Sequence, residues 1–337
     1  MNIFVNGSGA KQTGALSILE KYFSEYNLLQ ENHYYVASPF KPTYCPENVT
    51  WIKCSTNGLM TYLFAVVFCY YFVIRYRCDK IISFSNVNTI FPFPEKITYF
   101  HQSLIFSNVD FKFKILRFTI RFLNRKNNTF IFQNEYIKNI FCETFGGRYS
   151  LLVKWPGLNH EIKDEFNLDL GEEGVDFNYI VIPIIDLNDK NKNFTLALDI
   201  IKSCNDRPFL YFYVCSDDCD GIFKDITNLK FVGRKSQKDF YNLISRSSGV
   251  LICSLEETLC LPIFEAIALN KRVFVYERPY LSGVFDVLNK HINFNVEINT
   301  FQTIEFFFEA LDSTDSCSYE KDEIKIDSSY ILGQWDF

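Results

Sequence analysis

The sequence predicts an α/β protein with two domains, each built on a mostly parallel sheet that helices cover on both faces. Short apolar runs with the length of buried strands recur along the chain, and amphipathic helical stretches separate several of them. One polar, acidic segment interrupts this alternation near the middle of the chain. The length of 337 residues also suits two domains, since one domain usually holds about 100–200 residues.

The first half carries seven strand-like runs, which are NIFVN, HYYVAS, VTWIKC, DKIISFS, KITYFH, NTFIFQ and YSLLVKW. Helical spacing predicts a helix in ALSILEKYFSEYNLL and three more over 57–76, 110–126 and 135–144. The longest apolar run, Leu59 to Ile74, is shorter than the roughly 20 residues that span a bilayer. We therefore expect a buried helix there, between the sheet and the surface.

The alternation stops near residues 155–177, where the chain is polar, acidic and rich in glycine, as expected of a linker between domains. It restarts with the strand-like runs YIVIPI, FLYFYVC, LKFVG, GVLICS and RVFVYE. Helices are expected over 193–204, 236–246, 262–269 and 298–312. We therefore predict an N-terminal domain over 1–165, a C-terminal domain over 175–312, and a polar tail over 313–337 that packs back on the first domain or is loosely ordered.

Composition excludes several classes of protein. The net charge of −6 argues against nucleic acid as the main partner. The eleven cysteines are scattered and mostly lie in apolar runs, which favours free thiols in a reducing cytoplasm over disulfides or a zinc site. The first residues, MNIFVNGSGAKQTG, lack the features of a signal peptide.

The most informative segment is GVLICSLEETLCLPIFEAIALNKRVFVYE. A buried strand ends at Ser254, a loop carries Glu256 and Glu257, and Pro262 begins a helix that contains Glu265. Glu257 and Glu265 are eight residues apart, which is the spacing E-x7-E. Proline is favoured in the first turn of a helix, so the strand, loop and helix are well defined.

This geometry suits a nucleotide sugar. The backbone amides from Thr258 to Leu261, with Leu259 and Cys260 between them, would point free from the helix start and favour an anionic diphosphate. Glu257 can accept hydrogen bonds from sugar hydroxyls, and Glu265 from a ribose. The alternative is that the loop carboxylates are solvated and that Glu265 caps the helix or pairs on its surface.

The segment CSLEETLCLPIFEA closely resembles the donor-binding motif of glycosyltransferase family 4. Leu261, Pro262, Glu265 and Ala266 match in place, and Cys260 stands where the family usually has glycine. The resemblance covers residues 1 to about 290. It implies the GT-B fold, in which two Rossmann-like α/β domains face each other across a cleft, and transfer of a sugar with retention of configuration.

A second matching segment, YIVIPIIDLNDKNKNFTLALDII, resembles the strand, loop and helix where the family places a phosphate-binding lysine. The resemblance assigns that role to Lys192, with Asn193 beside it. Many members also carry an arginine a few residues earlier, and this chain has Pro183, Ile184 and Ile185 there. Without the family, a solvated lysine at a helix start is the alternative.

Two weaker segments follow the same resemblance. In LKFVGRKSQKDF, Gly233 and Arg234 would lie near the nucleotide, although a surface role suits Arg234 equally. In ITYFHQSLIF, His101 would lie near the reaction centre and donate a hydrogen bond to the donor sugar or orient the acceptor. A purely structural histidine is the alternative.

The loop after the first strand, FVNGSGAKQTG, contains Gly7, Gly9 and Gly14, which permit close backbone approach. In the family this loop reaches the donor diphosphate or the acceptor, whereas a plain turn is the alternative. The spacing is not GxGxxG, so a dinucleotide-binding fingerprint is absent and an oxidoreductase is disfavoured.

The resemblance implies a hexosyltransferase that extends a lipid-linked oligosaccharide in O-antigen or capsule synthesis. His101, Lys192 and Glu257 are its candidate catalytic residues. The donor is a co-substrate, so no cofactor is expected. No bound metal is expected either, because SDDCDG, with Asp217, looks like an acidic turn outside the donor motifs. A GT-B-fold epimerase or a non-catalytic relative that binds nucleotide sugars remains an alternative.

The stretch FKFKILRFTIRFLNRKNN interleaves basic side chains with Phe, Ile and Leu. A basic amphipathic helix of this kind can lie on an anionic membrane surface, so we expect membrane contact through residues 110–126. A solvated helix face is the alternative. The protein is then expected to be cytoplasmic and peripheral on the inner face of the plasma membrane.

Overall fold

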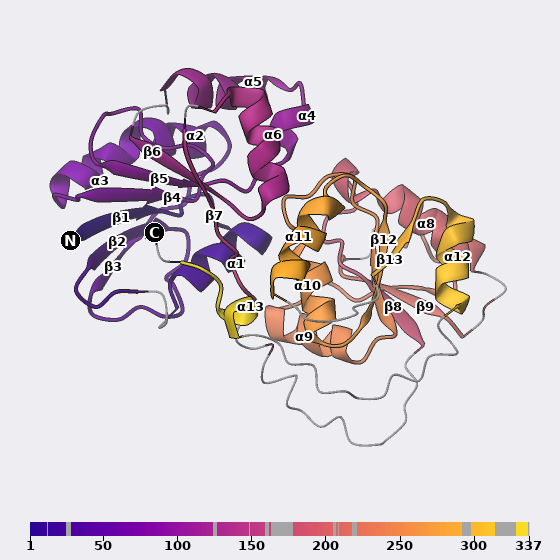
Figure 1. Cartoon of the computed structure of the whole chain (residues 1–337). Coiled ribbons are helices and arrows are strands. Elements are labelled where there is room, and N and C mark those ends of the chain that lie inside the picture. The colour runs from indigo at the N-terminus through magenta and orange to yellow at the C-terminus, as the bar shows by residue number, and fades with distance from the viewer. Residues whose placement is uncertain are drawn as a thin grey trace. The chain divides into compact units, whose positions relative to one another are not determined.

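The computed structural model describes residues 1–11, 13–24, 28–123, 127–147, 149–158, 162, 178–204, 207, 209–217, 221–291, 298–313, 328–335 and 337. They form two compact units (Figure 1). The first comprises Met1–Asn159, Ser282–Lys290 and Ser328–Phe337, and the second His160–Leu281 and His291–Asp327. The predicted boundary between 165 and 175 lies outside the described residues, as do most of the predicted linker and much of the tail.

The first unit contains a seven-stranded parallel sheet, and all seven strands predicted from the sequence are present. Its strands are β1 (Asn2–Asn6), β2 (His33–Ser38), β3 (Val49–Lys53), β4 (Lys80–Ser83), β5 (Glu95–Tyr99), β6 (Asn128–Phe132) and β7 (Ser150–Val153). They lie in the order β3-β2-β1-β4-β5-β6-β7. Strand β1 is central, and its residues Phe4 and Val5 are fully buried because helices cover both faces of the sheet.

Helices of the first unit pack on the sheet through apolar faces. They are α1 (Thr13–Tyr22), α2 (Leu59–Leu63), η1 (Phe64–Phe68), α3 (Cys69–Arg75), α4 (Leu104–Ser107), α5 (Phe111–Phe118), η2 (Thr119–Leu123), α6 (Glu135–Phe145) and α13 (Ser328–Leu332). The start of α6 is fixed by Asn134, whose side-chain oxygen accepts a hydrogen bond from the Ile137 amide at 2.9 Å. Ile137 and Phe141 then point into the core.

The helix expected over 57–76 is confirmed over Leu59–Arg75, but it is neither regular nor wholly buried. The segment is α2, η1 and α3 in succession, with a π-helical turn in the middle. One face is buried through Phe64, Ala65 and Val66, but Tyr71 and Ile74 on the other face are 58% and 62% exposed. Among the described residues, no helix is both long and apolar enough to cross a membrane.

The second unit contains a six-stranded parallel sheet in the order β10-β9-β8-β11-β12-β13. The strands are β8 (Tyr179–Ile182), β9 (Tyr211–Val214), β10 (Leu229–Phe231), β11 (Gly249–Ile252), β12 (Arg272–Tyr276) and β13 (Ile298–Phe301). The helical elements of the second unit are η3 (Lys190–Lys192), α8 (Phe194–Ser203), α9 (Gln237–Ser245), α10 (Leu261–Ala268) and α12 (Ile304–Asp312). Helix α11 (Leu281–His291) lies between α10 and α12 along the chain, and its residues Ser282–Lys290 belong to the first unit.

Two sequence predictions for the second half need correction. The helix expected over 298–312 begins only at Ile304, because residues 298–301 pair with β12 as strand β13. Helix α11 was not predicted, since Gly283 lies inside it and weakens its helical pattern. The five other predicted strands and the helices at 193–204, 236–246 and 262–269 are confirmed to within a few residues.

The last residues of the chain pack in the first unit, where both chain ends lie (Figure 1). The Trp155 indole donates to the Tyr330 carbonyl at 2.7 Å, and the Leu158 amide donates to the Ile331 carbonyl at 2.8 Å. Trp335 belongs to the core cluster around α1. Gly157 is required here, because it has φ +74° and a Cβ atom would lie 2.4 Å from the Ile331 oxygen.

Each sheet has one place where the direction of strand addition reverses. In the first sheet this reversal lies between β1 and β4, and in the second it lies between β8 and β11. Loops leaving the carboxyl ends of the two strands diverge there and leave room for a ligand. The loops after β1, β4, β8 and β11 are therefore the places to look for a site.

Candidate functional site

In the second unit, Asn191 joins the two loops at the reversal between β8 and β11. Its side-chain nitrogen donates to the Glu256 carbonyl at 2.7 Å, and its side-chain oxygen accepts from the Glu256 amide at 2.9 Å. Its own carbonyl accepts from the Leu255 amide at 2.8 Å. Three hydrogen bonds thus fix the loop after β11 against the loop after β8.

Next to this clamp, Lys192 and Glu257 form an ion pair. The Lys192 Nζ lies 2.6 Å from the Glu257 Oε1, and the two side chains are 34% and 16% exposed. Burial alone would lower the pKa of the Lys192 ammonium, but Glu257, Cys260 and Asp189 together outweigh burial and leave that pKa above its ordinary value. The lysine therefore carries a positive charge at neutral pH in a partly enclosed position.

The turn before α10 presents backbone amides. Cys260, at the helix N-cap, has φ 56° and ψ 63° and makes no side-chain capping bond, and Pro262 lies in the first turn. Among the described residues, no acceptor faces the amides of Leu259, Cys260 and Leu261. Unpaired amides at a helix start attract anions. The left-handed conformation of Cys260 also explains why glycine suits this position.

Glu265 lies inside α10 and is only 5% exposed, so the alternative of a cap or a surface pair is wrong. Its Oε1 accepts from the Tyr241 hydroxyl at 3.2 Å, and the Gln237 side chain donates to the same hydroxyl oxygen at 2.7 Å. Burial first, and then the charges of Glu257 and Glu265, raise the pKa of the Cys260 thiol, while Lys192 lowers it. Glu257, Glu265 and Lys192 are therefore close enough to Cys260 to influence its pKa.

The remaining donor-site candidates of this unit lie along the same edge of the sheet. Asn193 caps α8 with φ 52°, directly after Lys192. Gly233 follows β10 with φ +71°, and its amide donates to the Ser216 carbonyl at 3.2 Å. Arg234 is exposed, and Thr258 is half-buried in the turn after β11. Strand β9 separates β10 from β8 in the sheet. Gly233 and Arg234 therefore lie on the same edge as the Lys192–Glu257 ion pair but not directly next to it.

Sequence reasoning missed two side chains in the loop after β12. The Tyr280 hydroxyl is buried and has no hydrogen-bond partner in the described part of the chain. Burial, followed by the nearby Cys260 and Glu257, raises its pKa. The Arg278 Nε donates to the Leu255 carbonyl at 3.4 Å. The sequence feature that could have identified both side chains is the run RPY, residues 278–280, which closely follows a buried strand. Asn191 was missed because its partners are 65 residues away.

In the first unit, uncharged groups occupy the reversal between β1 and β4. The Asn6 side-chain nitrogen donates to the Ser83 and Ser85 hydroxyls at 3.2 and 3.3 Å, and the Ser8 hydroxyl donates to the Asn6 oxygen at 2.9 Å. Gly7 and Gly9 permit close packing here: a Cβ would lie 2.6 Å from the Leu19 side chain at Gly7 and 3.0 Å from the Thr61 methyl at Gly9.

His101 follows β5 and belongs to the same edge of this sheet. Its amide donates to the Asn86 side-chain oxygen at 2.7 Å, and its Nδ1 is buried without a hydrogen-bond partner among the described residues. Burial lowers the pKa of the imidazole to about 4. The ring is therefore neutral at pH 7 and can donate or accept one hydrogen bond, but it does not act as a cation.

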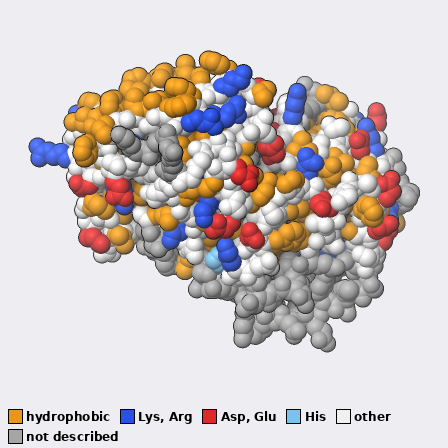
Figure 2. Space-filling model, turned by 45° about the horizontal axis from the view of Figure 1, so that its top comes forward, with side chains coloured by type: hydrophobic (Ala, Val, Ile, Leu, Met, Phe, Trp, Pro, Cys, Tyr) orange, Lys and Arg blue, Asp and Glu red, His pale blue; other side chains and the backbone are white. Residues whose placement is uncertain are grey.

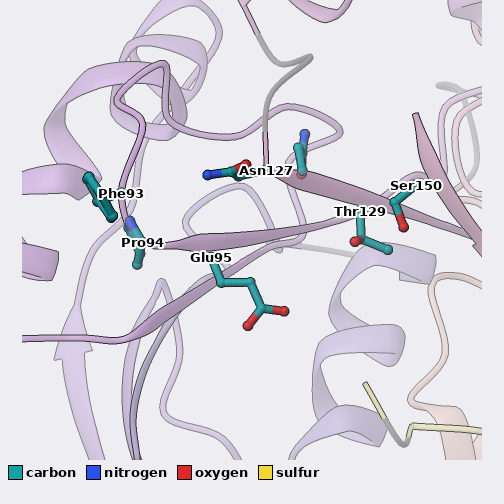
Figure 3. A pocket seen from close by; sticks show the side chains of 7 residues that line it. Phe93, Pro94, Glu95, Asn127, Thr129 and Ser150 are labelled. Atoms are coloured by element: carbon teal, nitrogen blue, oxygen red, sulfur yellow. The ribbon is translucent and has the colours of Figure 1, made fainter. Parts of the chain in front are cut away.

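A cavity of about 390 Å³ lies at the opposite edge of the first sheet (Figure 3). It is lined where strands begin, by Glu95 of β5, Thr129 of β6 and Ser150 of β7, together with Phe93, Pro94, Asn127 and Asn128. Open α/β sheets bind ligands at the carboxyl ends of their strands. This cavity is therefore not the predicted donor site.

Within the described residues, no group of three or more His, Cys, Asp or Glu side chains is arranged to hold a metal ion. Asp217 is described, but the rest of the acidic turn around it, residues 218–220, lies outside the described part. The expectation that the protein needs no metal and no cofactor stays a prediction.

No family model and no curated protein matches this sequence, but solved structures do. WaaG, a glycosyltransferase involved in lipopolysaccharide biosynthesis, has a TM-score of 0.65 and 11% identity over 94% of this chain and 91% of its own. Anabaena HepE, solved with UDP and glucose, has a TM-score of 0.63 and 14% identity over 94% and 90%. Sucrose-phosphate synthase of Thermosynechococcus elongatus has a TM-score of 0.66 and 12% identity over 93% and 89%.

These likenesses extend over almost the whole chain and show that it has the fold of GT-B glycosyltransferases, as the sequence predicted. At this level of identity they establish the fold and not the reaction. Membership of family 4 and the roles of individual residues stay predictions. These predictions rest on the local geometry at the two places where the direction of strand addition reverses.

Proposed function

We propose that this protein is a glycosyltransferase that moves a hexose-like sugar from a nucleotide diphosphate donor to an acceptor hydroxyl. The observation that carries the proposal is the reversal between β8 and β11. There, the positive Lys192 and the amides of Leu259, Cys260 and Leu261 flank one turn, and the Glu257 carboxylate lies beside them. The solved structures of the same fold include Anabaena HepE in complex with UDP and glucose, which supports a nucleotide sugar as the donor.

In the proposed reaction, the acceptor oxygen bonds to the anomeric carbon of the sugar. The bond from that carbon to the diphosphate oxygen breaks, the nucleoside diphosphate leaves with the bonding electrons, and the acceptor proton passes to the leaving group or to water. Lys192 and the turn amides stabilise the negative charge that develops on the leaving diphosphate. Retention of configuration is part of the proposal and follows from the resemblance to family 4.

Each carboxylate has a separate proposed role. Glu257 holds Lys192 through one oxygen, and its second oxygen is available to accept from a sugar hydroxyl. Glu265 is proposed to accept from the ribose, with Tyr241 fixing its orientation. In the first unit, His101 is proposed to donate one hydrogen bond to the donor sugar or the acceptor as a neutral imidazole, and the Gly7–Gly9 loop to permit close backbone approach.

The finer parts of the proposal concern the acceptor and the place of action. We propose a lipid-linked oligosaccharide acceptor in O-antigen or capsule synthesis, and a peripheral position on the cytoplasmic face of the membrane through residues 110–126. A WaaG structure is among the matches, and WaaG acts in lipopolysaccharide biosynthesis, which favours such an acceptor. The basic side chains Lys112, Lys114 and Arg121 on this stretch support the membrane contact.

The test begins with a thermal-shift screen of UDP-, GDP- and other nucleotide sugars. We expect one class of donor to raise the melting temperature and to release its nucleoside diphosphate when an acceptor is added. Turnover of the donor to an isomer without acceptor would instead indicate an epimerase. Binding without any product would indicate a non-catalytic protein and contradict the proposal.

The assignment of Glu265 is tested with Glu265→Gln, which keeps an acceptor for the Tyr241 hydroxyl. We expect affinity for the nucleoside diphosphate to fall by about tenfold, because a hydrogen bond to a charged acceptor is stronger than one to an amide. Tyr241→Phe is the control, since it removes the hydroxyl that bonds to Glu265 and Gln237 but leaves the Glu265 carboxylate in place. Equal affinity in Glu265→Gln and the wild type would contradict a role in ribose binding.

A further inference from the structure

The outer face of α2, η1 and α3 exposes large apolar side chains that no described segment covers. Leu59 is 64% exposed, Met60 51%, Phe68 48%, Tyr71 58% and Ile74 62%. Apolar side chains are often exposed singly, but a contiguous group on consecutive helical turns is unusual for a surface that only contacts water. This face therefore needs an explanation other than packing of the sheet.

A second helical segment with exposed apolar side chains lies beside it. The Tyr62 hydroxyl of α2 and the Thr119 hydroxyl of η2 share a hydrogen bond of 2.7 Å, and both segments bury residues in one core cluster. Outward from that cluster, Phe111, Phe118 and Phe122 are 76%, 56% and 59% exposed. We call the outer surface of residues 59–75 and 109–123 the exposed helical face.

The charges around the exposed helical face are mostly positive. Residues 57–77 contain no acidic side chain, and residues 104–123 contain only Asp110. Its cationic side chains are Arg75, Arg77, Lys112, Lys114, Arg117 and Arg121. In the space-filling view, hydrophobic side chains gather over the first unit, with Lys and Arg at the edge of that area (Figure 2).

We propose that the exposed helical face docks on an anionic lipid bilayer and that α2, η1 and α3 form its apolar, inserting part. Charge complementarity favours this occupant, because apolar and aromatic groups with cations at their edge suit the boundary between acyl chains and anionic head groups. The helical backbone satisfies its own hydrogen bonds, so it can enter that boundary without leaving polar groups unpaired. The proposal extends the contact through 110–126 and rests on that part of the proposed function.

The two segments contribute differently to binding. Lys112 and Lys114 attract the anionic surface over a distance that salt shortens. Tyr71, Ile74 and Phe68 contribute by removing apolar area from water, which salt does not weaken. A surface with both parts stays bound at ionic strengths that would release a purely basic helix. This difference separates the new inference from the membrane contact proposed for 110–126 alone.

The experiment is sedimentation of the full chain with vesicles of phosphatidylcholine alone and of phosphatidylcholine with phosphatidylglycerol. The test variant is Tyr71→Ser/Ile74→Ser, which changes two exposed side chains of α3. The matched control is Phe209→Ser/Ile222→Ser in the second unit, where the side chains are 75% and 72% exposed. A third variant, Lys112→Gln/Lys114→Gln, removes charge from α5.

We expect the wild type to bind vesicles that contain phosphatidylglycerol. The α3 variant should bind them about tenfold more weakly or worse, because part of its apolar area no longer leaves water. The control should bind within about twofold of the wild type, since its changes lie outside the face. The α5 variant should show a weaker preference for the anionic lipid and a weaker dependence on salt, because four of the six cationic side chains remain.

Equal vesicle binding by the α3 variant and the wild type would overturn the proposal. Failure of the wild type to bind any vesicles would also overturn it. A wild-type dimer that the two α3 substitutions break would show instead that the exposed helical face binds a second copy of the chain. Thermal shifts with nucleotide sugars, measured without vesicles, should be the same for all variants. They separate the two claims: vesicle binding without donor binding would leave the docking surface standing and remove the proposed reaction.

Discussion

Both units have a reversal in strand order, but the side chains at the two reversals differ in charge. Both sheets reverse the direction of strand addition once, and the loops that leave the two strands diverge at each reversal. In the second unit an ion pair, Lys192–Glu257, lies beside open turn amides. In the first unit, Asn6, Ser83 and Ser85 form an uncharged hydrogen-bond network. The fold therefore determines where a binding site can form, and the side chains at each reversal determine which kind of ligand it suits.

This difference suits the two substrates of the proposed glycosyl transfer. A diphosphate carries charge and needs cations and amide dipoles, whereas hydroxyl groups need neutral donors and acceptors. His101 follows the same division, because burial lowers its pKa to about 4 and keeps it uncharged at neutral pH. We therefore predict that charged side chains matter at the reversal between β8 and β11, and uncharged ones at the reversal between β1 and β4.

The largest effect is expected for Lys192→Met, which removes the partly enclosed cation and leaves Glu257 without its ion-pair partner. We expect turnover of the donor to fall by about 10²–10³, the loss typical of removing one group that stabilises a developing charge. Lys190→Gln is the matched control, because Lys190 is an exposed lysine in the same η3 turn. Steady-state kinetics of both variants checks this. Comparable losses in the two would mean that the ion pair has no special role.

Acid stability tests the neutrality of His101. Its folded pKa of about 4 lies below the unfolded value of about 6.5, so the unfolded chain binds more protons between these values. Stability should therefore fall as pH drops from about 6.5 to about 4, by up to about 3 kcal/mol from this group. His101→Gln should remove that part of the loss. Denaturant unfolding of both proteins at pH 7 and near pH 4.5 measures the difference, and parallel curves would contradict a neutral, buried ring.

Gly7→Ala should destabilise the protein by about 1–3 kcal/mol, because the new methyl would lie against the buried Leu19 side chain. Gly14→Ala is the control, since a Cβ there meets nothing within 4 Å and alanine favours a helix. Thermal unfolding compares the two. If Gly7→Ala were as stable as Gly14→Ala, the close approach of the first loop would not need glycine.

The smallest effect is expected for Cys260→Gly. Relief of the left-handed conformation gains about 1 kcal/mol, and the greater freedom of glycine in the unfolded chain offsets most of it. Stability and nucleotide affinity should therefore change by less than about tenfold in equilibrium constant. Cys260→Val sharpens the comparison, since a β-branched residue is strongly disfavoured at φ 56°. A valine variant as stable as the glycine variant would remove this explanation of the family's preference.

Much of the fold could be predicted because the strands are short, apolar and bounded by polar residues. Strand β13 and helix α11 were exceptions. Strand β13 is short and carries the polar Asn299, and α11 contains Gly283, so neither has a clear period. The exposed face of α2 and α3 was also missed, since an apolar run alone does not tell which of its residues face the sheet.

The site was predictable where one segment carries it and not where the sheet order assembles it. Glu257, Cys260 and Glu265 lie within nine residues, so their spacing predicted one place. The clamp by Asn191 depends on β8 lying next to β11, which no local pattern reveals. Tyr280 likewise reaches this place only through the neighbouring strand β12.

The path of the chain has a consequence for synthesis. Residues 328–335 and Phe337 pack against Trp155 and Tyr22 in the unit that begins with Met1, so the second unit is inserted into the first. On the ribosome, the second unit can complete its sheet while the earlier one still lacks its closing segment. We therefore expect the unit that is translated first to finish folding last, and a protein shortened by residues 328–337 to lose the N-terminal core before the C-terminal one.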